Sequence, residues 1–178
     1  MTTPSGSLSL AQEHLRVMLA DCATFRTLCE ADNRAEALAH LHHEGLPAPA
    51  NGTEHTAAEH ADLRPWGIVF MADQRGFSRR LIATETFRSA GRLRLRLART
   101  CPDVNGADEP TSDAMLEWKN ILGGIIGELC DLATAGDIEH LAFDEIGVDF
   151  GPFAAAPELA ATQGLWQGVE LSVSWGGE

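Results

Sequence analysis

Apolar residues recur in the first part of the chain at the three- and four-residue spacing of an α-helix. Over 8–28 they form one stripe, with a break expected near 21–24. The stripe consists of Leu10, Leu15, Met18, Leu19, Cys22, Phe25 and Leu28. A second, short helix is predicted over 34–42, where Asp32 or Asn33 can cap the first turn. The chain therefore begins with a group of helices.

The middle of the chain changes to strand patterns. Residues 66–72 form an uninterrupted apolar run, which favours a strand covered on both faces. A strand of mixed character is predicted over 77–87, followed by a turn at 89–91. Leucine and arginine then alternate strictly over 92–97. Because side chains alternate across a strand, one face of this segment is leucine and the other is arginine.

The clearest helix is predicted over 111–135, where apolar residues again fall at three- and four-residue steps. Thr111 or Ser112 is available as its N-cap. Three glycines inside it each cost about 1 kcal/mol of helix propensity relative to alanine. They are Gly123, Gly124 and Gly127. We expect close packing of this helix on a sheet to offset that cost.

Two further strands are predicted over 138–150 and 165–175. Together the segments predict an α+β fold, with a mainly antiparallel sheet of about five strands packed by one long helix and the N-terminal helices. The length suits a single domain over 1–178. Glycine, proline, alanine, histidine and threonine without a period predict a long surface loop at about 45–64.

The charge of the chain is unevenly placed. Residues 75–99 hold eight arginines against one acid, a local charge of +7 that leaves −20 for the rest of a chain whose total is −13. The acidic total argues against sequence-specific binding of nucleic acid, which requires a local excess of Lys and Arg toward phosphate. Four of the arginines are the candidate interface residues: Arg88, Arg92, Arg94 and Arg96.

Two interpretations of these arginines stay open. They solvate the outer face of an antiparallel strand, as charged residues often do. Alternatively, the sheet presents an arginine-bearing edge that docks against the acidic surface of another copy, a heterologous contact that closes into a ring where the rotation permits. In the second case we expect additional apolar contacts between copies, with the long loop as one source.

No pattern of catalytic, cofactor-binding or metal-ligating residues emerges. The segment from His55 to His60 reads H-x-x-x-E-H, which matches neither spacing that places two zinc ligands on one helical face. The four cysteines form no C-x-x-C pair, so we expect reduced thiols. No apolar run is long enough for a membrane span and no signal peptide is visible, which predicts a protein made in the cytoplasm. We expect neither an enzyme nor a bound cofactor.

The sequence resembles the tail-terminator and head-to-tail connector proteins of long-tailed phages. The resemblance rests on the opening Leu-Arg-Val-Met-Leu-Ala-Asp-Cys-Ala-Thr-Phe-Arg-Thr-Leu, on the helix 118–132, and on the closing Leu-Ser-Val-Ser-Trp-Gly. It is diffuse, spans nearly the whole chain, and includes no catalytic signature. The long loop at about 45–64 departs from the family pattern.

The resemblance implies a virion structural protein that is assembled in the host cytoplasm. Such a subunit forms a homo-oligomeric ring, commonly of six copies, which caps the tail tube protein and meets the head-side connector protein. Whether DNA passes through the lumen stays open. The alternatives are another neck or tail-completion protein, or a small ligand-binding or enzymatic domain with a site built from the long loop and the strand ends.

Overall fold

The computed structural model of the chain describes residues 7–48, 52, 59, 62–71, 78–81, 87–105, 109–135, 138–151 and 166–177. Side chains are described at these positions except at 7–9, 71, 78–81, 87–90, 138–140, 144–151 and 177. Most of the predicted loop at about 45–64, including His55 and His60, lies outside the described residues.

The described part of the chain contains four helices and six strands. The helices are α1 (Ser7–Asp21), α2 (Ala23–Leu28), α3 (Arg34–Ala39) and α5 (Ser112–Ala135). The strands are β1 (Leu41–His43), β2 (Trp66–Met71), β3 (Ser78–Leu81), β4 (Phe87–Thr100), β5 (Ile138–Gly151) and β6 (Trp166–Gly177). This set of elements confirms the predicted α+β class and its one long helix.

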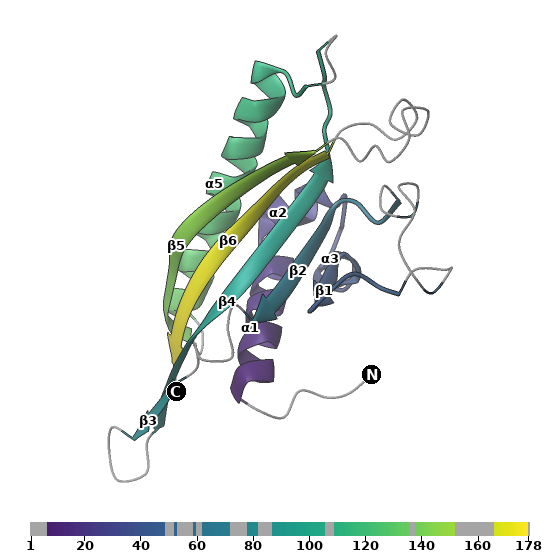
Figure 1. The fold of residues 1–178 in the computed structure, drawn as a ribbon. Helices are drawn as coiled ribbons and strands as arrows, with labels where there is room; N and C mark the ends of the chain where they lie inside the picture. The colour runs from purple at the N-terminus through teal and green to yellow at the C-terminus, as the bar shows by residue number, and fades with distance from the viewer. Residues whose placement is uncertain are drawn as a thin grey trace.

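The helices cover one face of a curved sheet, and no described helix lies on the other face (Figure 1). Between the two layers, Trp118 and Leu129 of α5 pack in one cluster with Leu95 and Leu171 of the sheet. All four side chains are at most 1% exposed. Burying each such side chain stabilises the fold by about 1.5–3 kcal/mol, so this interface between the layers holds the sheet in place.

The sheet has the strand order β1-β2-β4-β6-β5, and β3 pairs with β4 beside that path. The pair β1·β2 is parallel, and the other pairs are antiparallel. The prediction for 66–72 is confirmed, because β2 lies between two strands and both Ile68 and Val69, on its opposite faces, are buried. β4 is the middle strand of the path.

The predicted turn at 89–91 is wrong. These residues belong to one continuous strand, β4, in which Ser89 and Ala90 pair with Gly177 and Gly176 of β6. On the other side the same stretch of β4 pairs with β3. We call β3 and its partner residues Phe87–Ala90 the arm, because they extend past the end of the sheet (Figure 1). Pairing with two strands outweighs the turn preference of small residues.

The predicted helix over 34–42 ends early. Asn33 caps it as expected, since its side chain accepts a hydrogen bond from the Glu36 N–H at 3.1 Å. However, α3 stops at Ala39, and Leu41–His43 form β1, which pairs with β2. A strand of three residues is too short to show a period in the sequence, so only its distant partner reveals it.

The internal glycines of α5 do not pack on the sheet, which corrects a second expectation. A Cβ atom at Gly123 or Gly127 would meet nothing within 4 Å. A Cβ atom at Gly124 would lie 2.9 Å from Thr24 Oγ1, so the close approach there is to α2 and not to the sheet. The predicted cap is confirmed, because the Ala114 N–H donates to Thr111 Oγ1 at 3.3 Å.

Candidate functional site

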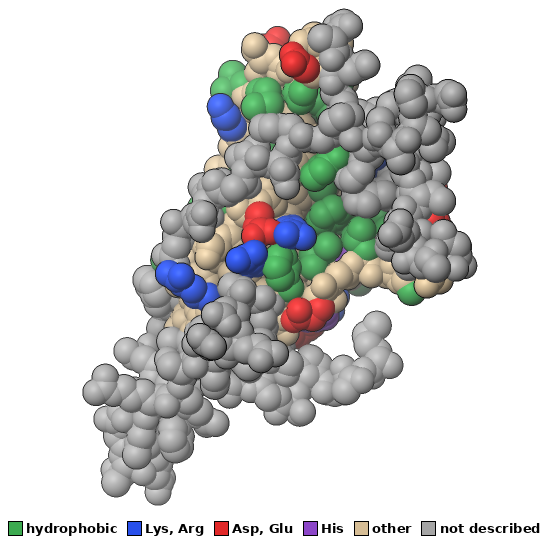
Figure 2. Space-filling view, viewed as in Figure 1, with side chains coloured by type: hydrophobic (Ala, Val, Ile, Leu, Met, Phe, Trp, Pro, Cys, Tyr) green, Lys and Arg blue, Asp and Glu red, His purple; other side chains and the backbone are tan. Residues whose placement is uncertain are grey.

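The candidate site is the face of the sheet that carries no described helix, which we call the open face. Leu93, Leu95 and Leu97 of β4 are at most 1% exposed on the helix side. The alternating positions Arg92, Arg94 and Arg96 therefore lie on the open face, which confirms the predicted separation of leucine from arginine. Figure 2 shows basic and acidic side chains together near the middle of this face, beside a band of apolar side chains.

Glu170 of β6 lies between two of these arginines. Arg94 Nη1 is 2.9 Å from Glu170 Oε1, and Arg96 Nε is 2.5 Å from Glu170 Oε2. The side chains of Arg94 and Arg96 are 43% and 52% exposed, so the pairs contribute only about 0.2–1 kcal/mol each. Arg92, two positions before Arg94 on the same strand, is exposed on the same face.

The sequence suggested that the arginines lie at an edge of the sheet, and this expectation is wrong. β4 pairs with β2 and β3 on one side and with β6 on the other, so the stripe runs along the middle of the sheet. Arg88 lies farther along β4, in the arm, where its Cα pairs with that of Arg80. Its side chain lies outside the described residues.

An apolar cluster lies next to the arginines on the open face. Trp66, Ile68 and Ala98 are its buried members, and Leu46, Leu63, Phe70 and Trp166 pack around them. The Arg96 guanidinium lies 5.0 Å from the centroid of the Phe70 ring, a cation–π distance that joins the charged stripe to the cluster. Sequence reasoning missed this cluster, because its members come from four separate segments of the chain.

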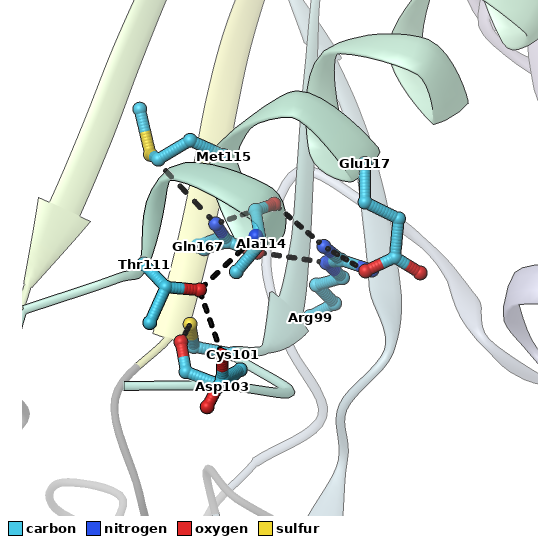
Figure 3. Close-up of polar contacts among 8 residues, drawn as sticks. All are labelled: Arg99, Cys101, Asp103, Thr111, Ala114, Met115, Glu117 and Gln167. Atoms are coloured by element: carbon cyan, nitrogen blue, oxygen red, sulfur yellow. Dashed lines mark hydrogen bonds and ion pairs between the residues drawn. The ribbon is translucent and has the colours of Figure 1, made fainter. Parts of the chain in front are cut away.

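Arg99 continues the arginine series but points the other way. Its Nε donates to Gln167 Oε1 at 2.9 Å, and its Nη2 donates to the Ala114 carbonyl at 3.1 Å (Figure 3). Glu117 lies 3.2 Å from the same Nη2. Because the Arg99 side chain is only 7% exposed, this network joins β4, β6 and the first turn of α5 within the fold. The sequence contained a signal for this orientation, because Arg99 lies two residues after Leu97 and therefore on the leucine face of β4.

A hollow of about 440 Å³ lies between α2 and α5, beside this network. It is lined by Ala23, Thr24, Thr27, Leu28, Arg99, Glu117 and Ile121. Its two charged groups, Arg99 and Glu117, pair with each other. The hollow therefore offers a ligand no net charge. It includes Arg99 at the C-terminal end of β4 but no described residue of the loop at about 45–64, from which a ligand site was expected.

Cys22 and Cys29, both buried in the core, are not activated nucleophiles. Burial raises the pKa of Cys22 and of Cys29 to about 12, so both thiols stay protonated near neutral pH. In the described part of the chain, no group of three or more His, Cys, Asp or Glu residues has the geometry to hold a metal ion. His40 bonds to the Pro65 carbonyl at 2.8 Å, and His43 bonds to Glu13 at 2.8 Å.

Comparison with known proteins does not indicate a function for the chain. The chain matches no protein-family model, and no curated protein matches it either. Among the described residues, no helix has both the length and the apolar character that crossing a membrane requires.

Proposed function

We propose that the chain is a ring-forming virion structural protein, a tail terminator that caps the tail tube and joins it to the head-side connector. The resemblance in sequence suggests this role, and the α+β fold is compatible with it. In the mechanism we envisage, each copy docks its arginine-bearing surface against the acidic surface of the next copy. Repetition of one such heterologous contact closes a ring.

One observation carries the proposal: an exposed row of arginines lies on the open face of a chain that is otherwise strongly acidic. Arg94 and Arg96 share the one carboxylate group of Glu170, and residues 75–99 carry +7 while the rest of the chain carries −20. Opposite charges on one molecule steer copies of it together and set their orientation. The partly buried members of the apolar cluster beside the arginines, Leu46, Leu63, Phe70 and Trp166, have apolar area left for such a contact.

Native mass measurement tests the ring. We expect an assembly of several copies of the 19.1 kDa chain, with six as the number that the resemblance implies. Reversing two charges in Arg92→Glu/Arg94→Glu is expected to leave monomers. The matched control is Lys119→Glu, which reverses an exposed charge on α5, away from the open face, and is expected to keep the assembly.

A second measurement separates a terminator from another neck or tail-completion protein. A terminator caps the tube, so adding the protein to a polymerising tail tube protein is expected to stop elongation and leave short tubes with one capped end. A protein that binds only the head-side connector leaves the tube length unchanged. A monomer that binds a small compound in the hollow between α2 and α5 contradicts both assignments.

A further inference from the structure

The two long sides of the sheet differ in what they leave unpaired. β5 forms one side, and all of its described backbone pairing is with β6. On the opposite side, β3 pairs with β4 alone among the described strands. An edge strand presents a row of free N–H and C=O groups that another strand can complete. Among the described strands, none lies beside the outer edge of the 14-residue β5 (Figure 1).

The two sides also carry opposite charge. Within Ile138–Gly151 there are four acids and no Lys or Arg. The acids are Glu139, Asp144, Glu145 and Asp149. The arm carries the reverse, with Arg79 and Arg80 on β3, Arg88 on β4, and no acid in either segment. A basic strand on one side and an acidic strand on the other make the molecule complementary to a second copy of itself.

We propose that the arm of one copy adds as a strand to the β5 edge of the next copy. This inference rests on the proposed ring and names its contact. Each copy then donates one side of its sheet and accepts on the other, so the contact is heterologous and repeats around the ring. Main-chain hydrogen bonds between the strands provide the affinity, and the charges select the pairing.

The strand directions agree with this arrangement. β6 runs antiparallel to β4, and β5 runs antiparallel to β6, so β5 and β4 share a direction. β3 runs antiparallel to β4 and hence also to β5. In a ring whose axis lies along the strands, neighbouring copies keep these directions, and the arm meets β5 as an antiparallel partner.

The arm and the arginine stripe are close along the chain. Arg92 lies two residues after the end of the arm on β4, so Arg88 and the stripe belong to the same strand. Level with the arm in the sheet, Ala90 pairs with Gly176, which in turn pairs with His140. A neighbouring β5 placed beside the arm thus begins near this level.

A charge-exchange experiment tests the contact. Arg79→Glu/Arg80→Glu gives the arm a net charge of −1 opposite the acidic β5, and Glu139→Arg/Asp144→Arg/Glu145→Arg gives β5 a net charge of +2 opposite the basic arm. Each variant alone is expected to be monomeric by native mass spectrometry, because like charges meet at the contact. A one-to-one mixture is expected to recover the wild-type mass with the two variants alternating. Recovery also shows that both variants are folded.

Disulfide trapping gives a second, independent readout. In a Cys130→Ser background, Ser78→Cys is combined with either Glu139→Cys or Glu145→Cys, which sample two registers along β5. We expect oxidation to link neighbouring copies for at least one pair and to link none with Ser78→Cys alone. If the wild type forms rings, the charge variants keep the ring mass and no cross-link forms, this inference is wrong while the proposed ring is still supported. Wild-type chains that stay monomeric overturn both.

Discussion

Two polar residues of β6 differ in what surrounds their side chains, and this difference sets what each contributes to stability. Gln167 is fully buried and joins Arg99 to the Ala114 carbonyl, whereas Glu170 is partly exposed between Arg94 and Arg96. Removing a hydrogen-bond partner from a buried group leaves that group desolvated without compensation. An exposed ion pair, in contrast, returns to water at little cost.

We therefore predict that Gln167→Leu lowers the free energy of unfolding by about 1–3 kcal/mol, because the Arg99 Nε–H loses its partner. Glu170→Gln, three residues away on the same strand, is the matched control and is expected to cost less than about 1 kcal/mol. Urea unfolding followed by tryptophan fluorescence measures both. Equal losses from the two variants contradict the assignment of Arg99 to the buried network.

Glu13 gives the fold a defined response to acid. Burial raises the pKa of its carboxyl group, but hydrogen bonds and charge from Arg16 and His43 outweigh burial, so the pKa lies below the ordinary 4.5. A lowered pKa means that folding favours the ionised form. The resulting stabilisation is complete above pH 4.5 and is lost as the pH falls through the lowered value.

The measurement is the urea midpoint of the wild type and of Glu13→Gln between pH 7 and pH 3. The wild type is expected to be the more stable of the two at pH 7, and the difference is expected to shrink below pH 4.5. A difference that stays constant across this range contradicts a lowered pKa. The contact matters because Glu13 binds His43, which ends the edge strand β1.

The glycines of α5 permit a test of what the helix contacts. Gly123 and Gly127 have open space around a Cβ atom, so alanine gains helix propensity there without a clash. At Gly124 the new Cβ displaces Thr24, whose hydroxyl group donates to Glu128 at 2.5 Å. The same substitution thus has opposite consequences at neighbouring positions of one helix.

We expect Gly123→Ala and Gly127→Ala each to raise the free energy of unfolding by about 1 kcal/mol. The free energy of unfolding of Gly124→Ala is expected to be lower than that of both other variants. The lost hydrogen bond and the displaced Thr24 side chain offset the gain in helix propensity. Chemical denaturation of the three variants in parallel gives the order. If all three are equally stabilised, α2 does not approach α5 at Gly124.

The elements that the sequence predicted well are those whose pattern is long and local. The helix over 111–135 and the alternation over 92–97 both show many periods, and both are confirmed. β1 and the continuous β4 were missed because their existence depends on pairing with distant strands. The small residues at 89–91 are compatible with both a turn and a strand, so the turn predicted from these residues alone was wrong.

The candidate site was predictable to a similar degree. Strict alternation placed Arg92, Arg94 and Arg96 on one face from the sequence alone. Their position in the middle of the sheet was not predictable, because strand order follows from contacts far apart along the chain. The pairing of Arg94 and Arg96 with Glu170 joins residues more than 70 positions apart. No local pattern contains that information.

The uneven distribution of charge over the chain predicts how assembly depends on salt concentration. The total of −13 makes copies repel one another at long range, while the +7 segment and the acidic remainder attract at contact. The screening length is about 30 Å at 0.01 M salt, about 10 Å at 0.1 M and about 3 Å at 1 M. Intermediate salt therefore suppresses the repulsion between whole molecules and spares the attraction between groups a few ångströms apart.

We thus expect the mass measured by light scattering to pass through a maximum near 0.1 M salt and to fall on either side. At lower salt the repulsion between acidic chains dominates, and at higher salt the contact between the arm and β5 is screened. Circular dichroism at each salt concentration serves as the control for folding. A mass that rises steadily up to 1 M instead points to apolar burial as the force between copies, because salt does not screen it, and gives the arginines only a solvating role.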